Sequence, residues 1–311
     1  MLKDTVALLR TFKGFSRKSV LKELVEVLGD SSFDDAGMFE LEGWKIVVTA
    51  EGIVEDIILE DPWSAGYYSV MTNVNDALVK GARPVGYWNV LSSNSPGIRR
   101  KIAEGIKFGL DKYAIKPLKG HTEPDTPHHS IVAGIVGIAK NFIPSTTANE
   151  KNDIVVAIDL DGKFERKGWV HTFDSIHHKT TQQIQQRMDG IIGVANQKLA
   201  EASRDISGPG IVGSLAMMCE SSGKGAEVDL AKLPKPAMLD LDSWLTTYPS
   251  SGFIFATSKP EPCLEILRSN GFTTEKVGKI TPIPKILVKY GNEQETFIDF
   301  RKESCFAQLG G

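Results

Sequence analysis

Apolar residues along the chain alternate between the spacing typical of helices and the spacing typical of strands. In residues 16–28 they recur every three or four positions behind serines that can cap a helix, which predicts an amphipathic helix. Residues 37–41 and 44–49 are short apolar runs separated by Glu42 and Gly43, a pair that favours a hairpin turn. The first part of the chain therefore predicts a helix followed by a β-hairpin.

The later apolar runs predict further strands and helices in both halves of the chain. Proline at the first turn of a helix and glycine after its last turn set several of the boundaries. The predicted helices span residues 62–80, 97–113, 181–203, a segment after Pro209, and 261–270. The predicted strands span residues 85–91, 131–139, 154–159, 252–257, 277–280, 286–290 and 296–300. Residues 120–129 are predicted to form a loop, and residues 160–180 an irregular segment.

A polar segment rich in Pro, Ser, Thr and Asn, residues 141–152, separates the two halves. Such composition is typical of a boundary between domains. We therefore predict an α/β (α+β) protein with an N-terminal domain over residues 1–148 and a C-terminal domain over residues 149–311. The length of 311 residues agrees with two domains.

Composition narrows the classes of function. The net charge of -3 gives no basic excess, so we expect no nucleic-acid partner. The longest clean apolar run, residues 131–139, is too short to cross a bilayer, and the N-terminus lacks the features of a signal peptide. The 3 cysteines lie far apart, which predicts neither disulfides nor a metal–thiolate site. We expect a cytoplasmic protein without a membrane partner.

A glycine motif in the second half matches the dinucleotide-binding pattern G-x-G-x-x-G. It consists of Gly208, Gly210 and Gly213, and Asp229 stands near the expected acidic position. The pattern carries that function only directly after a strand. The preceding residues look charged and helical, so we predict no dinucleotide site. Glycine-rich backbone at the start of a helix remains a good place for an anion, although these glycines also fit a simple tight turn.

Several carboxylates stand beside small or turn-forming residues on separate segments. They are Asp34 and Asp35, Glu51, Asp76 and Asp205. Carboxylates on separate turns can together supply the hard oxygen ligands that Mg²⁺ prefers. Each one taken singly is also compatible with a solvated turn or a helix cap. Asp76 differs because it interrupts a largely apolar helical pattern, where an unpaired carboxylate is costly.

All 6 histidines fall in two clusters, one at residues 121–129 and one at residues 171–178. Clustered His and Asp can bind Zn²⁺, Mn²⁺ or Fe, but neither spacing fits a known metal signature. A polar surface loop is the simpler interpretation of the second cluster, whereas the first cluster is expected directly between two strands, where loops often carry function. Lys13, Arg17 and Lys18 near the N-terminus are compatible with phosphate contacts, and a solvated helix start is the simpler interpretation there too.

Read in order, these segments resemble one superfamily. The matching pieces are Asp34-Asp35-Ala36, Thr49-Ala50-Glu51-Gly52, residues 60–84 (EDPWSAGYYSVMTNVNDALVKGARP), KGHTEPD at 119–125, residues 204–230 (RDISGPGIVGSLAMMCESSGKGAEVDL) and residues 250–272. The superfamily is PurM-like and contains aminoimidazole ribonucleotide synthetase, selenophosphate synthetase and thiamine-monophosphate kinase. The chain is most similar to its AIR synthase-related branch, which includes proteins called methanogenesis marker protein 2.

The chain also departs from the pattern of these enzymes. The N-terminal Cys or Sec and Lys of selenophosphate synthetases have no counterpart, and the usual Thr-Asp pair appears as Thr49-Ala50-Glu51. The start of the second half lacks the glycine-rich segment of the thiamine kinases. These departures leave open whether Glu51 replaces the usual ligand.

The resemblance implies a fold, two cofactors and a set of site residues. It implies an N-terminal four-stranded sheet that pairs in a homodimer to form a β-barrel, and a C-terminal α/β layer. It also implies that ATP and Mg²⁺ bind near the barrel's interface, in a cleft towards the second domain. Asp35, Asp76 and Asp205 fall on positions for metal and phosphate binding. His121 and Thr122 fall on a loop that lines the same cleft.

We therefore predict an ATP- and Mg²⁺-dependent phosphoryl-transfer enzyme, a kinase or synthetase, that acts on an unidentified small molecule. The predicted metal ligands are Asp34, Asp35, Asp76 and Asp205, and the predicted catalytic residues are Asp76 and His121. The predicted nucleotide-binding residues are Thr49, Glu51, Asn75, Gly120, Thr122, Gly208 and Gly210. One alternative is a non-catalytic nucleotide-binding or assembly protein on the same scaffold. Another is a metallohydrolase that uses His121, Asp125, His128 and His129.

Overall fold

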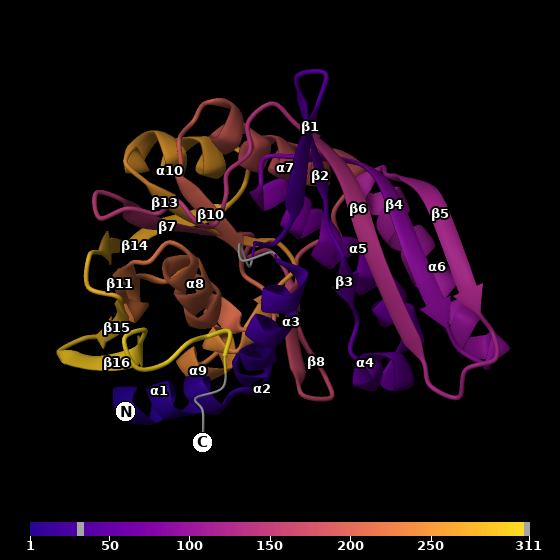
Figure 1. The fold of residues 1–311 in the computed structure, drawn as a ribbon, viewed down its shortest axis with the longest axis horizontal. Helices are drawn as coiled ribbons and strands as arrows, with labels where there is room; N and C mark the ends of the chain where they lie inside the picture. The colour runs from indigo at the N-terminus through magenta and orange to yellow at the C-terminus, as the bar shows by residue number, and fades with distance from the viewer. Residues whose placement is uncertain (30–33, 308–311) are drawn as a thin grey trace.

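A computed structural model of the chain describes residues 1–29 and 34–307, and two large sheets organise it (Figure 1). The helices are α1 (Leu2–Thr11), α2 (Lys13–Ser16), α3 (Leu21–Leu28), α4 (Glu55–Glu60), α5 (Pro62–Val79), α6 (Pro96–Tyr113), α7 (Thr181–Asn196), α8 (Gly210–Ser221), α9 (Leu241–Leu245) and α10 (Pro260–Ser269), with 3₁₀ turns η1 (Arg17–Val20) and η2 (Leu230–Lys232). The strands are β1 (Gly37–Leu41), β2 (Trp44–Val48), β3 (Glu51–Gly52), β4 (Arg83–Ser92), β5 (Lys116–Glu123), β6 (Ser130–Ala139), β7 (Asp153–Ile158), β8 (Lys163–Lys167), β9 (Val170–Asp174), β10 (Ala202–Asp205), β11 (Gly225–Asp229), β12 (Thr247–Pro249), β13 (Gly252–Thr257), β14 (Thr273–Thr281), β15 (Lys285–Tyr290) and β16 (Glu293–Asp299). The α/β class predicted from the sequence is confirmed.

The first sheet has the strand order β1-β2-β6-β4-β5, and β3 pairs with β6 beside β2. Helices α5 and α6 pack against one of its faces (Figure 1). The β1–β2 hairpin turns at Glu42 and Gly43, whose φ angles of 50° and 83° match the turn that suits the right-handed twist of paired strands. The sheet has one strand pair, β4 and β5, that runs parallel. It is larger than the four-stranded sheet predicted, because β5 and the short β3 join it.

Helix α5 is buried along most of its length and carries Asp76 into the interior. It begins at Pro62, behind Asp61, whose carboxylate accepts a hydrogen bond from the Ser64 backbone N–H. A Cβ on Gly66 would lie 2.0 Å from the carbonyl oxygen of Ile102, so α5 and α6 touch backbone to backbone there. This close packing fixes the position of α5 and therefore of Asp76.

The second sheet has the order β10-β13-β7-β14-β11-β15-β16 and is covered on both faces. Alternate residues of β7 enter two different cores. Val155 and Ala157 pack with α5 and α7, whereas Val156 and Ile158 pack with α8 and α1. The first of these cores spans both halves of the chain. A smaller sheet of β12, β9 and β8 lies below α5 and carries Trp169 in its β8–β9 turn.

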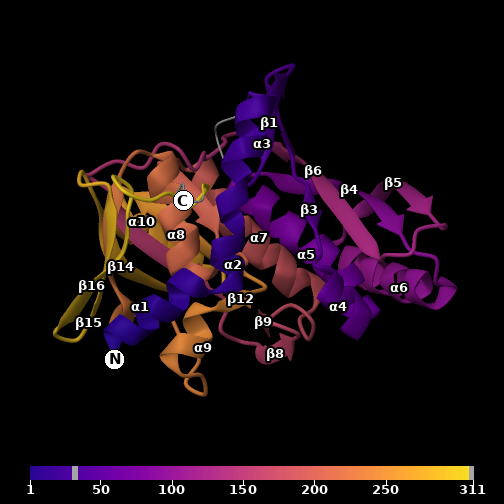
Figure 2. The same ribbon diagram turned by 60° about the horizontal axis from the view of Figure 1, so that its bottom comes forward.

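The N-terminal helices cross the front of the molecule between the halves (Figure 2). Leu2, Val6 and Leu9 of α1 are buried in the core of the second half. The predicted division at residue 148 separates the two large sheets, but α1 packs across that division. The division into domains over residues 1–148 and 149–311 remains a prediction.

Three sequence predictions about local structure are wrong. The helix predicted to residue 203 ends at Asn196, and residues 202–205 form strand β10. Their polar side chains are buried because they have partners: the Ser203 hydroxyl, for example, donates a hydrogen bond to the Val79 carbonyl. Within residues 160–180, residues 163–167 form β8 and residues 170–174 form β9, and β5 extends into the predicted loop as far as Glu123. No helix in the described part of the chain is both long and apolar enough to cross a membrane.

Candidate active site

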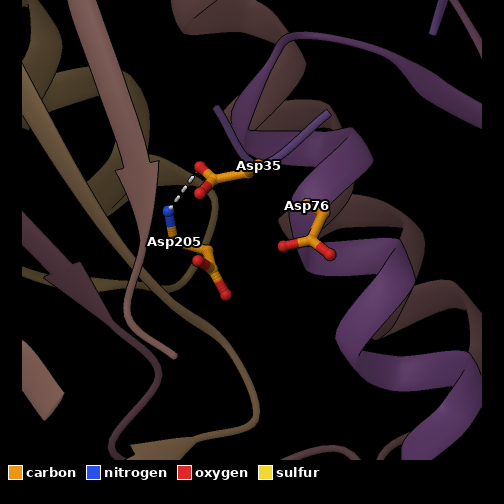
Figure 3. A group of neighbouring side chains, drawn as sticks. All are labelled: Asp35, Asp76 and Asp205. Atoms are coloured by element: carbon orange, nitrogen blue, oxygen red, sulfur yellow. Dashed lines mark hydrogen bonds between the residues drawn. The ribbon is translucent and has the colours of Figure 1, made fainter. Parts of the chain in front are cut away.

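Three aspartates from separate elements meet at the junction of the two halves (Figure 3). Asp35 precedes β1, Asp76 lies on α5, and Asp205 ends β10. One carboxylate oxygen from each lies within 4.8 Å of the others, and no other group of three or more His, Cys, Asp or Glu side chains meets this criterion among residues 1–29 and 34–307. The buried Asp76 Oδ2 has no hydrogen-bond partner among the described residues. Such an arrangement can bind a divalent cation.

The spacing of the three oxygens bears on which cation they can hold. Opposite oxygen ligands of Mg²⁺ lie about 4.2 Å apart in an octahedron, and those of Ca²⁺ somewhat further apart. A spread of at most 4.8 Å is close to both spacings, so small side-chain movements bring the three oxygens into the shell of one divalent cation of either size. The residues present fit the cation implied by the resemblance.

Two buried cations hold Asp35 in place. The Lys80 ammonium lies 3.1 Å from Asp35 Oδ2, and the Arg204 guanidinium lies 3.0 Å from Asp35 Oδ1. The side chain of Lys80 is fully buried, and it also donates hydrogen bonds to the Ser145 hydroxyl and the Ser203 carbonyl. These contacts set the orientation of the Asp35 carboxylate.

Asp34, a predicted metal ligand, is used differently. Its Oδ1 lies 2.6 Å from the Lys80 ammonium, and its two oxygens accept hydrogen bonds from the Ser145 backbone and hydroxyl groups. Burial acts to raise the pKa of Asp34, but the Lys80 charge and these hydrogen bonds outweigh it and lower the pKa. Asp34 is outside the group of three, and its contacts anchor the segment before β1.

The acidic groups at this junction outnumber the cations that face them. Burial, followed by the nearby charges of Asp205, Glu51 and Asp35, raises the pKa of Asp76 well above its ordinary value. Burial, followed by the charge of Asp35, also raises the pKa of Asp205 well above its ordinary value. The pKa of Glu51 is raised too, mainly by burial. A bound divalent cation would relieve this repulsion.

The raised pKa values predict that stabilisation by Mg²⁺ depends on pH. A carboxyl with a raised pKa in the folded chain contributes stability below its unfolded pKa of about 4, and that contribution is lost as the pH rises through the folded pKa. The metal-free protein should therefore lose stability as Asp76 and Asp205 ionise. We expect the increase in Tm on adding Mg²⁺ to be larger at about pH 8 than at about pH 5. Thermal unfolding across this range measures it, and an increase that is the same at both pH values would contradict the prediction.

A cleft of about 150 Å³ opens over Asp76 and Asp205. The N-terminal segment, α4 and α5, the β8–β9 turn and the residues after β10 all contribute to its walls. Its lining includes Phe12, Arg17, Lys18, Glu51, Ile57, Trp169 and Gly208. The cleft thus joins an acidic floor to aromatic and basic walls.

A second cavity of about 280 Å³ reaches Asp35 and has no lining residue in common with the cleft. Trp88 and Val48 line it, and strand register places both on the sheet face that α5 and α6 leave uncovered. Trp88 lies against Gly134, where a Cβ would come within 2.4 Å of the indole ring. The three carboxylates therefore border two cavities.

The other predicted site residues fall into two groups. Gly208 and Glu51 line the cleft, and Thr49 lines the second cavity while its hydroxyl donates a hydrogen bond to Asn73. Asn75 donates instead to the Tyr248 hydroxyl and the Ser250 carbonyl. Gly210 starts α8 with a φ of 74°, and a Cβ there would meet the Leu245 carbonyl at 2.1 Å, so its role is to permit close packing.

Gly120, His121 and Thr122 lie on the exposed edge strand β5 and line neither cavity. The His121 ring pairs with Glu123 at 2.7 Å. The expectation that this segment lines the cleft is wrong for a single chain, because β5 pairs with β4 at the far edge of the sheet. His121, Asp125, His128 and His129 also form no three-residue metal group among the described residues, which removes the basis of the metallohydrolase alternative.

The glycine motif at residues 208–213 does follow a strand, contrary to the sequence analysis. β10 precedes it directly and α8 follows. However, β10 pairs antiparallel with β13, and β11, the strand after α8, lies elsewhere in the sheet. A dinucleotide-binding unit needs two adjacent parallel strands around the helix. The prediction that the glycine motif forms no dinucleotide site therefore holds because of the strand order, and not because a strand is missing before the motif.

Sequence patterns missed Lys80, Arg204 and Trp169. Lys80 and Arg204 read as ordinary charged residues at the ends of elements, and only the tertiary structure brings them to Asp35. The local pattern around Lys80 did not mark it, because a lysine between the last turn of a helix and a glycine stop is ordinarily solvated.

Two family matches cover most of the chain. Residues 33–139 match AIR synthase related protein, N-terminal domain, and residues 163–290 match AIR synthase related protein, C-terminal domain. The chain belongs to the AIR synthase related family. An uncharacterised protein of Methanocaldococcus jannaschii is 34% identical over 97% of this chain and 98% of that protein. Selenide, water dikinase of Escherichia coli is 25% identical over 67% of this chain and 62% of that enzyme.

Solved structures show that this AIR synthase related chain has the PurM-like fold. PurL of T. maritima, complexed with AMPPCP, superimposes with a TM-score of 0.75 at 17% identity, over 94% of this chain and 50% of that chain. AaThiL, complexed with AMPPCP and TMP, gives a TM-score of 0.67 at 17% identity, over 89% of this chain and 94% of that chain. This chain spans about half the length of PurL.

Proposed function

We propose that this AIR synthase related protein transfers a phosphoryl group from ATP, with Mg²⁺, to a small molecule. The observation that carries the proposal is the group of Asp35, Asp76 and Asp205, buried between two cavities. In phosphoryl transfer the attacking oxygen of the acceptor and the leaving oxygen of ATP lie roughly in line on opposite sides of the transferred phosphorus, while a metal ion binds the phosphate oxygens. Relatives whose names describe a dikinase or a complex with AMPPCP support ATP as the donor.

Asp76 and Asp205 would hold Mg²⁺ directly, with Asp35 as the third ligand. When bound, the ion neutralises charge on the phosphate oxygens. Lys80 and Arg204 keep Asp35 oriented toward the other two carboxylates. The backbone around Gly208, at the start of α8, faces the cleft and can donate hydrogen bonds to anionic oxygens. Glu51 adds a fourth acidic group beside them.

Nucleotide binding and acceptor turnover test the proposal separately. Isothermal titration should show AMPPCP binding that requires Mg²⁺ and is lost in Asp205→Asn. ADP release should then rise with one member of a panel of small metabolites. Mg²⁺-dependent binding without ADP release for any of them would favour the non-catalytic alternative, and absence of binding would contradict the nucleotide assignment itself.

We also propose that two copies of the chain pair through the uncovered face of the first sheet, as the resemblance implies. That face is apolar on successive strands: Val90 and Val132 are register partners, and Leu41 faces Trp44 on the hairpin. Val132 is 40% exposed and Trp44 49% exposed. Because the second cavity opens on the same face, a second copy would also close that cavity.

Val132→Lys is expected to convert the dimer to a monomer, since it places a charge from each copy in an apolar interface. Light scattering after gel filtration should give the mass of two chains for the unmodified protein and of one chain for the variant. Met238→Lys, at a residue that is 73% exposed and lies away from this sheet, is the matched control and should remain dimeric. An unmodified protein with the mass of one chain would refute the proposed pairing.

A further inference from the structure

The N-terminal segment forms a fixed wall of the cleft. A Cβ on Gly14 would lie 2.0 Å from the Gly208 carbonyl oxygen, so α2 touches the start of α8 backbone to backbone. Phe15 packs against Gly213 on the same helix, where a Cβ would lie 2.9 Å from its ring. This contact places Arg17 and Lys18, which follow one residue later, at the cleft.

Arg17 and Lys18 have no ion-pair partner within the part of the chain that the structure describes. Lys167, on the neighbouring strand β8, does pair with Asp61. The positive charges of Lys18 and Arg17 act on the carboxyl of Glu51 across the cleft and work to lower its pKa. The wall therefore carries two available positive charges that face an acidic floor.

Trp169 supplies an aromatic surface and an unused donor beside these charges. Its buried Nε1 has no hydrogen-bond partner among the described residues. The Arg17 guanidinium carbon lies 5.9 Å from its ring centroid, and the Phe12 ring packs edge-on against it at 6.2 Å. Ile53 and Ile57 continue the apolar surface toward Asp76. A buried indole N–H usually has an acceptor, and an acceptor in the cleft reaches this one when the Trp169 side chain shifts.

We propose that the cleft binds the phosphoryl acceptor, and that this acceptor is an organic anion with a planar or apolar body. Its carboxylate or phosphate group contacts Arg17, Lys18 and the Trp169 N–H, and its body lies against Phe12, Trp169 and Ile57. Its nucleophilic end then faces Asp76 and Asp205. This inference rests on the proposed phosphoryl transfer and leaves the second cavity for the nucleotide.

The chemistry of the walls favours an organic anion over a triphosphate. A triphosphate tail alone has no apolar part to cover the aromatic wall. ATP as a whole also carries a planar base, so measuring AMPPCP affinity in the Arg17 and Lys18 variant separates the two ligands. An organic anion uses the guanidinium and ammonium groups at one end and apolar contacts at the other. Free inorganic phosphate lacks the apolar part, and phenol lacks the anionic charge.

The test uses simple probes of this chemistry on the full chain with Mg²⁺ and saturating AMPPCP. Phenyl phosphate, benzoate, phenol and inorganic phosphate are titrated in parallel. We expect phenyl phosphate or benzoate to bind at least about tenfold more tightly than phenol and inorganic phosphate. Which of the two binds better identifies the anionic group. Equal binding of all four probes, or no binding of the aromatic anions, would overturn the inference.

Variants then locate the binding. The double substitution Arg17→Gln and Lys18→Gln should weaken the better aromatic anion at least about tenfold, while AMPPCP affinity changes less than about twofold. Trp169→Leu should reduce the preference for the aromatic anion over inorganic phosphate. Arg100→Gln with Lys302→Gln removes the same charge from exposed positions outside the cleft. This double variant should change neither the affinity for the aromatic anion nor the affinity for AMPPCP.

Failure of the inference differs from failure of the proposed function. If the Arg17 and Lys18 variant loses AMPPCP affinity as strongly as phenyl phosphate affinity, the two cations bind the nucleotide and the inference is wrong. If AMPPCP fails to bind the unmodified protein with Mg²⁺, the proposed phosphoryl transfer is wrong, whatever the probes show.

Discussion

Replacing Asp76 by Asn is expected to lower ATP turnover by about a hundredfold to a thousandfold while the protein stays folded. The substitution keeps the shape of the side chain and removes the charge needed to hold Mg²⁺. Because burial and neighbouring acids raise the pKa of Asp76, the charged form is costly without a metal. The variant should therefore unfold at the same or a higher temperature than the metal-free protein. ADP release and thermal unfolding measure the two effects.

Asp125→Asn is the matched control for this substitution. Asp125 is exposed and belongs to the histidine cluster at residues 121–129, so it tests the charge change without touching the three carboxylates. Its turnover should equal that of the unmodified protein. Turnover that survives in Asp76→Asn, or falls equally in both variants, would remove Asp76 from the central role given to it.

Replacing Lys80 by Met is expected to destabilise the protein by about 3–5 kcal/mol. Lys80 is fully buried and lies within 3.1 Å of a carboxylate oxygen on both Asp34 and Asp35, so Met leaves two buried carboxylates without that cation. The loss should also weaken Mg²⁺ binding, because Asp35 is no longer held in place. Urea unfolding gives the change in stability, and titration with Mg²⁺ gives the change in affinity.

Two further variants separate the positioning role of Lys80 from its structural role. Lys179 is equally buried and pairs with Asp159 and Asp161, away from the cleft. Lys179→Met should lower stability in a similar way but leave Mg²⁺ affinity unchanged. Combining Lys80→Met with Asp34→Asn should recover part of the stability by removing one orphaned charge. Equal Mg²⁺ affinity in Lys80→Met and the unmodified protein would show that Lys80 is structural alone.

The sequence indicates much of the fold because local signals and tertiary packing agree over most of the chain. The β1–β2 hairpin, α5 and β13 follow their predicted bounds closely. The sequence did not predict strand β10 because its residues are polar. Polar side chains are buried only where groups from other segments form hydrogen bonds or ion pairs with them. Those partners, such as the Val79 carbonyl for Ser203, lie far away in the sequence.

The candidate site was predictable in part. Asp76 stands out from residue pattern alone, because a carboxylate within an apolar helix needs a reason. Asp35 and Asp205 stand among several carboxylates beside turn-forming residues, the resemblance assigns them to metal binding, and the structure brings them to Asp76. The separate role of Asp34 and the remote position of His121 depend on packing between distant segments, which single-residue patterns do not encode.

The most direct measurement is a crystal structure of the protein grown with Mn²⁺ and AMPPCP, in which anomalous scattering locates the metal. We predict a manganese peak bonded at about 2.2 Å to Asp76 and Asp205, next to Asp35, with phosphate oxygens completing its shell. A peak at any other place, or a nucleotide whose phosphates lie away from these three side chains, would contradict the account.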